Sequence, residues 1–171
     1  MYPKEYIDFL VHFHGDRDYF ECHEILEEYW KKTDPANKNS ILVGLILLAV
    51  ACYHHRRENF NGAKRTLEKS IAIFKKNDIE LQHMGIDPTH LIGALNLKLK
   101  DIRLENKYSS FSLPITDQSL LSTCQKMCLQ NNLTWCQESD IQNKELIHRH
   151  ATRDRSEVIS ERLKALKNGS E

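Results

Sequence analysis

Residues 41–53 read ILVGLILLAVACY, which is the longest apolar run in the chain. A helix that crosses a membrane needs roughly 20 apolar residues, so this run is too short to span a bilayer. Apolar side chains would lie on almost every side of a helix built from it, which is typical of a buried central helix. Ser40 is suited to cap its start, and the basic residues up to Arg57 suit the negative end of its dipole. The run therefore predicts a central helix over residues 41–57.

Further helices are predicted on both sides of this run from apolar residues spaced three and four positions apart. They span residues 5–13, 16–32, 59–76, 88–106, 118–129 and 156–167. A turn is expected over residues 84–86 and an extended segment over residues 108–117, whereas residues 130–150 show no clear preference. We expect an all-α fold, a compact helical bundle of about five core helices with a looser helical C-terminal region.

The domain organisation follows from where this pattern weakens. Residues 1–107 are predicted to form the helical bundle domain. Residues 108–171 are predicted to be a C-terminal helical extension, packed on the bundle or on a partner subunit.

Composition limits the classes of partner and compartment. Charged residues make up 28% of the chain and their formal net charge is zero, which argues against nucleic acid and anionic membranes as partners. The N-terminus lacks the apolar core of a signal peptide, so a cytoplasmic protein without a membrane partner is expected. The five cysteines are then most simply reduced thiols.

The predicted helix over residues 16–32 is acidic and carries one histidine. A helix turns by about 100° per residue, which allows its side chains to be sorted by face. One arc collects Tyr19, Cys22, Leu26, Tyr29 and Trp30 as the core face, and the opposite arc collects Glu21, Glu24 and Glu28. His23 and Glu27 lie between the two arcs, one turn apart. They can hydrogen-bond to each other for structure, which is the simpler interpretation, or they can share a metal ion.

Two other groups of residues point to possible sites. If the central helix packs antiparallel to the acidic one, a cluster of His14, Asp18, His23, Glu27 and His54 is conceivable, and these are residue types that bind divalent metals. Basic groups at residues 54–57, 64–65 and 148–155 could together form an anion-binding patch, although glutamates lie among them. Cys124 and Cys128 share a helix face, and packing explains them better than zinc does.

Two segments resemble a known family. FHGDRDYFECHEILEEYW (residues 13–30), followed by LAVACYHHRREN (residues 48–59) and Gly62-Ala63, is similar to the domain of unknown function 309. The resemblance covers residues 5–76 and implies a compact helical bundle of the kind found in bacteria and archaea. It also implies a "predicted metal-dependent hydrolase", a label given to some members. The matching motif residues are Phe20, Glu21, His23, Glu24, Glu27, Trp30, Tyr53, His54, Arg57 and Asn59.

This chain departs from the family pattern at two positions. Leu47 stands where the family has a glutamine, which removes a polar group from the expected site. Glu58 stands where a glycine commonly precedes the asparagine.

Three functional hypotheses follow. The first is an interaction or scaffold protein, or a small-ligand-binding module, with a homodimer or a protein as partner. The alternative is a metal-dependent hydrolase in which His23, Glu27 and His54 hold a divalent metal such as zinc and Glu24 or Asp18 acts on a water molecule. Tyr53, Arg57 and Asn59 would then bind the ligand. The weaker alternative is binding of anions or RNA through the basic groups.

Overall fold

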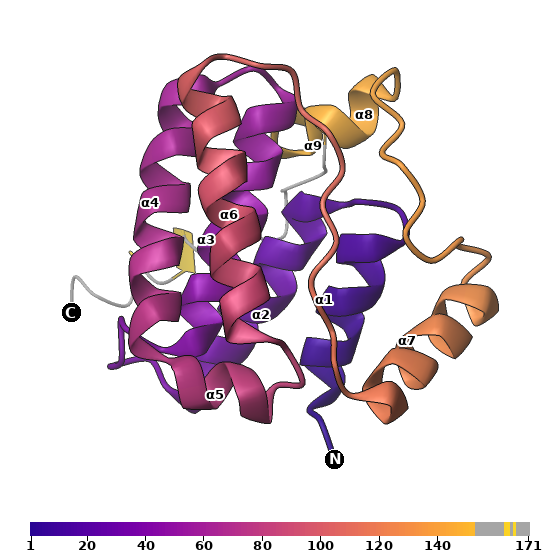
Figure 1. The fold of residues 1–171 in the computed structure, drawn as a ribbon. Coiled ribbons are helices and arrows are strands. Elements are labelled where there is room, and N and C mark those ends of the chain that lie inside the picture. The colour runs from indigo at the N-terminus through magenta and orange to yellow at the C-terminus, as the bar shows by residue number, and fades with distance from the viewer. Residues whose placement is uncertain (153–162, 165, 167–171) are drawn as a thin grey trace.

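The computed structural model describes residues 1–152 together with residues 163, 164 and 166. Its helices are α1 (Lys4–His14), α2 (Tyr19–Thr33), α3 (Ile41–Arg56), α4 (Phe60–Lys76), α5 (Asp78–His83), α6 (Pro88–Arg103), α7 (Gln118–Gln130), α8 (Lys144–Ile147) and α9 (Arg149–Thr152). The described residues contain no strand, only an isolated antiparallel bridge between Ile86 and Ile115. The fold is all-α, as predicted (Figure 1).

Helix α3 lies at the centre of the bundle, as its apolar sequence predicted. It packs against α2 and α4, while α1 packs on α2 and α6 packs on α4 (Figure 1). The contact between α3 and α4 is close because Gly44 has no side chain, and a Cβ there would lie 2.8 Å from Cε1 of Phe74. Ser70 of α4 is fully buried and donates a hydrogen bond of 2.8 Å to the Gly44 carbonyl. These contacts fix how α3 and α4 cross.

The helix starts are set by side-chain caps. Asp18, Ser40, Asn59 and Asp87 each accept a hydrogen bond from a backbone N–H in the first turn of the helix that follows. Helix α2 begins at Tyr19, later than predicted, because Arg17 adopts a left-handed φ of 57° and Asp18 is the cap. Helix α5 was not predicted, since its single buried residue, Leu81, gives too short an apolar pattern.

The C-terminal part of the described chain returns to the bundle and completes its core. Helix α7 packs on α1, and its buried Leu120, Cys124 and Cys128 belong to the same hydrophobic core as α1. The extended segment before α7 contributes Leu113 to that core. Arg17 is 1% exposed and donates hydrogen bonds to the carbonyls of Phe111 and Gln137. Most of the helix predicted over residues 156–167 lies outside the described residues.

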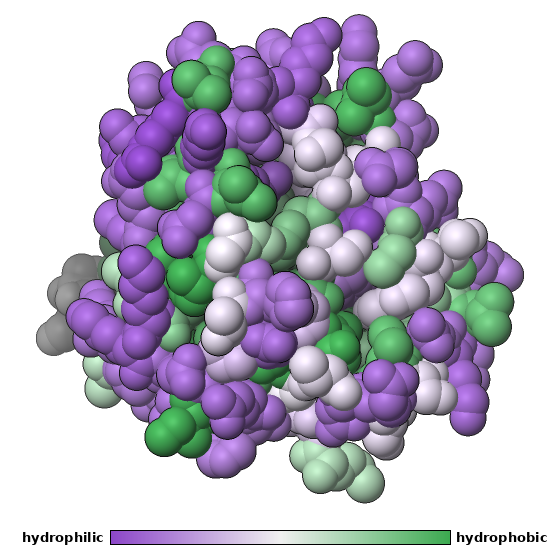
Figure 2. All heavy atoms as spheres, viewed as in Figure 1, coloured by the Kyte–Doolittle hydropathy of each residue, from purple (hydrophilic) through white to green (hydrophobic). Residues whose placement is uncertain are grey.

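The surface is mixed in character. Hydrophilic side chains cover much of the face drawn in Figure 2, and hydrophobic ones form separate patches between them. None of the described helices combines the length and the apolar character that crossing a membrane requires. The five cysteines are free thiols, of which Cys136 is exposed and the other four are buried.

Candidate functional site

A cavity of about 230 Å³ lies between α2 and α3. Because α2 and α3 pack side by side, residues from the first turns of α2 face residues from the last turns of α3. Helix α9 supplies one further residue from the C-terminal part of the chain. The cavity is lined by Tyr19, Phe20 and His23 of α2, by Val50, Tyr53, His54 and Arg57 at the end of α3, and by His150 of α9.

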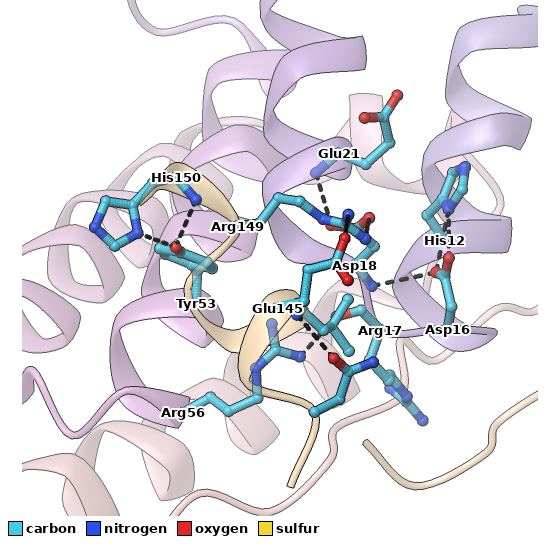
Figure 3. Close-up of polar contacts among 12 residues, drawn as sticks. His12, Asp16, Arg17, Asp18, Glu21, Tyr53, Arg56, Glu145, Arg149 and His150 are labelled. Carbon is cyan, nitrogen blue, oxygen red and sulfur yellow. Dashed lines mark hydrogen bonds and ion pairs between the residues drawn. The ribbon is translucent and has the colours of Figure 1, made fainter. Parts of the chain in front are cut away.

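Tyr53 is the residue through which α9 is attached to this cavity. Its hydroxyl accepts a hydrogen bond of 3.1 Å from the backbone N–H of His150 and also hydrogen-bonds to Nδ1 of the His150 ring (Figure 3). The Arg57 guanidinium carbon lies 5.3 Å from the centroid of the Tyr53 ring, a cation–π contact. Phe20 packs its ring 5.9 Å from that of Tyr53. The cavity therefore has an aromatic wall and a cationic rim.

The charges that line the cavity are of one sign. Among the described residues, its lining includes an arginine and three histidines but no carboxylate. Burial lowers the pKa of His54 below its usual value, and the nearby charges of Arg57, Arg65 and His150 lower it further. Nε of Arg57 is buried and has no hydrogen-bond acceptor in the described part of the chain. The described lining thus offers hydrogen-bond donors and the positive charge of Arg57.

Two other arginines near Arg57 also have buried nitrogens without a hydrogen-bond partner among the described residues. The buried side-chain nitrogens and oxygens without a partner, among described residues, all belong to Arg56, Arg57 and Arg149. Arg56 is 6% exposed, stacks over Tyr19 at 4.7 Å and donates to the carbonyl of Arg17 at 2.7 Å. Buried polar atoms are normally satisfied, so this end of the α2–α3 pair has an excess of donors.

Asp18 balances part of this positive charge. Its carboxylate caps α2 by accepting from the N–H of Glu21 at 3.1 Å, and it pairs with Arg149 at 3.1 Å (Figure 3). Burial raises the pKa of Asp18, while the hydrogen bond from Glu21 and the charge of Arg149 oppose that rise. Arg149 also pairs with Glu145 at 3.3 Å. Asp18 therefore holds the C-terminal segment against the start of α2.

The predicted metal ligands separate into a pair and a single residue. Nε2 of His23 lies 2.6 Å from Oε2 of Glu27, and the other oxygen of Glu27 pairs with Lys31 at 2.7 Å. In the described part of the chain, no three His, Cys, Asp or Glu side chains form a group that could hold a metal ion. His54 therefore does not join His23 and Glu27 in such a group of described residues, although His23 and His54 both line the cavity.

The two predicted catalytic carboxylates do not line the cavity. Asp18 is engaged in capping α2 and in pairing with Arg149. An oxygen of the Glu24 carboxylate lies 4.0 Å from Nδ1 of His23.

The three predicted ligand-binding residues lie at or beside the cavity. Tyr53 and Arg57 line it. Asn59 caps α4 through its Oδ1 and uses its amide nitrogen to hydrogen-bond to Nδ1 of His54 at 3.1 Å. Asn59 thus orients a lining residue. His150 was missed as a site residue, and the only signal for it was the basic group over residues 148–155.

His14, which the sequence placed in a possible metal cluster, is a structural residue. It is fully buried, with Nδ1 2.8 Å from the Leu10 carbonyl and Nε2 accepting from the N–H of Leu113 at 3.0 Å. Its ring stacks on Trp135 with centroids 4.4 Å apart. With both nitrogens engaged by the backbone, His14 has no lone pair to offer a metal.

Comparison with known proteins gives a family and a full-length relative. Residues 6–66 match the model described as "Domain of unknown function (DUF309)". The "Uncharacterized protein YpuF" of Bacillus subtilis (strain 168) is 46% identical over 166 residues, which cover 97% of this chain and 95% of that protein. No solved structure shows a significant match. The family match covers α1 from Tyr6 onward, α2, α3 and the start of α4, and so contains every described lining residue except His150.

Proposed function

This chain belongs to the DUF309 family, and we propose that it is a binding module that takes up a small organic anion in the cavity between α2 and α3. The observation that carries the proposal is the buried Nε of Arg57, which has no acceptor among the described residues and faces a cavity whose described lining holds no carboxylate. A bound carboxylate or phosphate would supply that acceptor. Arginine is well suited to this because its planar fork can hold such a group with two parallel hydrogen bonds.

The rest of the cavity supports an organic anion over an inorganic ion. Phe20, Val50 and the rings of Tyr19 and Tyr53 provide apolar surface beside the cationic rim. Pockets for drug-sized ligands hold roughly 300–1,000 Å³, so a cavity of about 230 Å³ suits a smaller molecule. Such a ligand would place its ring or alkyl chain against Phe20 and its anionic group near Arg57.

The test is calorimetric titration of the purified protein with a matched set of ligands. Benzoate and phenyl phosphate carry the anion, and benzamide is an uncharged analogue of similar shape. Binding of at least one anion, with no binding of benzamide, is expected. Charged hydrogen bonds contribute about 1.5–3 kcal/mol, so Arg57→Gln should weaken binding about 10- to 100-fold.

A second arginine provides the control. Arg103 on α6 is 55% exposed, pairs with Glu68 and does not line the cavity. Arg103→Gln removes the same charge and should leave the affinity unchanged. The proposal fails if neither anion binds, or if the two variants weaken binding equally, because the effect would then be one of overall charge.

The metal-dependent hydrolase alternative is not favoured, since the candidate ligands do not gather in one group. A cytoplasmic location is part of the proposal and is supported by the free thiols, which are typical of a reducing compartment. The homodimer or protein partner expected from the sequence stays a prediction that sedimentation analysis would test.

A further inference from the structure

A second cavity, of about 150 Å³, lies between α6, the end of α3 and the extended segment that follows α6. It shares no lining residue with the cavity between α2 and α3. Its lining combines charged, hydroxyl and apolar side chains, namely His55, Ala94, Leu97, Lys98, Asp101, Ser109, Ser110 and Phe111.

Lys98 is the unusual residue in this lining. It is only 7% exposed, and its ammonium nitrogen lies 3.4 Å from Nδ1 of His55 and 5.0 Å from the centroid of the Tyr108 ring. The polar partner of this ammonium among the described residues is Nδ1 of His55, which is not an anion. Lysine is almost never buried to this extent unless an anion pairs with it, because desolvating an unpaired charge is costly.

The hydrogen bonds of His55 show that it cannot be that anion. Nε2 of His55 lies 2.8 Å from the carbonyl oxygen of Asn106, which can only accept, so Nε2 carries the proton. Nδ1 is then unprotonated, and its lone pair faces the Lys98 ammonium. His55 is therefore neutral and occupies one of the three ammonium donors, which leaves two for a ligand.

Asp101 places a negative charge in the same cavity. It follows Lys98 by three positions on α6, so the two side chains leave the same face of the helix. They do not pair directly, because Lys98 turns inward to His55 while Oδ1 of Asp101 accepts from the Asn106 amide at 3.1 Å. A cation and an anion thus line one cavity without neutralising each other.

We propose that this cavity binds a small aliphatic α-amino acid as its zwitterion. The ligand carboxylate accepts from the Lys98 ammonium and the Ser109 hydroxyl, and the ligand ammonium donates to the free oxygen of Asp101. A water molecule occupies about 30 Å³ in the liquid, so a cavity of about 150 Å³ holds roughly five groups of that size. Glycine and alanine have about that number of non-hydrogen atoms. Ala94 and Leu97 provide an apolar surface for a side-chain methyl group.

The experiment is titration of the full chain, by ligand-observed NMR, with L-alanine, propionate and ethylamine. Propionate lacks the ammonium and ethylamine lacks the carboxylate, so alanine should bind more tightly than either. Lys98→Met keeps the buried stem and removes the charge, and it should weaken alanine binding about 10- to 100-fold. Lys100→Met, at an exposed position of the same helix, is the matched control and should bind as the unmodified protein does.

Asp101→Asn tests the second charge at an exposed position and keeps an oxygen that can accept from the Asn106 amide. It should abolish the preference for alanine over propionate while leaving propionate binding intact. Alanine binding in Arg57→Gln should be unchanged, so this proposal and the one for the α2–α3 cavity can fail separately. The proposal is overturned if alanine does not bind, binds no better than propionate, or binds equally to Lys98→Met.

Discussion

At the scale of single residues, His14 shows how a histidine in a motif can serve the fold. Burial lowers its pKa to about 3, with the charge of Arg17 acting in the same direction and the hydrogen bond to Leu10 opposing. The neutral ring donates through Nδ1 to the Leu10 carbonyl and accepts at Nε2 from Leu113. Protonation would place a second N–H against the Leu113 N–H, so the charged form is incompatible with this packing.

The resulting prediction concerns acid. Above about pH 6.5, His14 is neutral in both the folded and the unfolded protein, so its full contribution to the stability of the fold is present. Below that pH His14 is protonated in the unfolded chain but stays neutral in the folded protein. The free energy of unfolding therefore falls by about 1.4 kcal/mol per pH unit as the pH approaches 3. Urea unfolding at pH 7.5 and 4.5 should show a smaller loss for His14→Gln than for the unmodified protein. Equal losses would contradict this assignment.

Glu58 carries the second prediction at this scale. It is exposed and has a left-handed φ of 63°. Glycine adopts this conformation without steric cost, whereas a residue with a Cβ atom adopts it only at a steric cost. Glu58→Gly should therefore raise the free energy of unfolding by about 0.5–1 kcal/mol. In Lys69→Gly, the glycine would lie inside helix α4 and should lower the free energy of unfolding by about 1 kcal/mol. If both variants were destabilised, that would argue against strain at Glu58.

At the scale of helices, two glycines with opposite surroundings provide a matched pair. A Cβ on Gly44 would meet Phe74 and Ile73 of α4 at 2.8 and 3.0 Å, whereas a Cβ on Gly93 of α6 would meet nothing within 4 Å. Gly44→Ala should lower the free energy of unfolding by about 1–3 kcal/mol by forcing α3 and α4 apart. Gly93→Ala should raise it by about 0.5–1 kcal/mol. Thermal unfolding measures both, and a stabilised Gly44→Ala would disprove the close crossing.

The sequence predicted most of these helices because their signals are local. The apolar run over residues 41–53 identified α3, and Ser40 marked its start. The His23–Glu27 pair also follows from helical spacing alone. Trp30 was predicted on the core face; it is half-buried and packs against the hydrophobic core, while its Nε1 donates to the Asn37 carbonyl at 3.1 Å.

At the scale of the whole molecule, the cavity depends on contacts that sequence spacing does not contain. His150 reaches Tyr53 across 97 positions, and Arg149 reaches Asp18 across 131. Only the return of the chain along α1 brings them there. Residues on α2 and α3 could be proposed as a site from their motifs, but the wall formed by α9 could not.

This return also leads to a prediction about cooperativity. We propose that residues 1–107 and the described residues beyond them unfold together, because α7 shares the core of α1 and Trp135 stacks on His14. In Trp30→Phe the fluorescence reports on Trp135 alone, the other of the two tryptophans. Its denaturation curve should coincide with that from circular dichroism. Two separate transitions would mean that the C-terminal region is an independent unit.

The distribution of cysteines affects how the protein must be handled. Cys136 is exposed, whereas the other four thiols are buried, and burial raises the pKa of Cys124 to about 12. An alkylating reagent should therefore modify one thiol per folded chain and all five after unfolding, which mass spectrometry can count. Storage in air should join two chains through Cys136, and Cys136→Ser should remain unlinked. An apparent dimer in an oxidised sample is thus a chemical product of one surface sulfur.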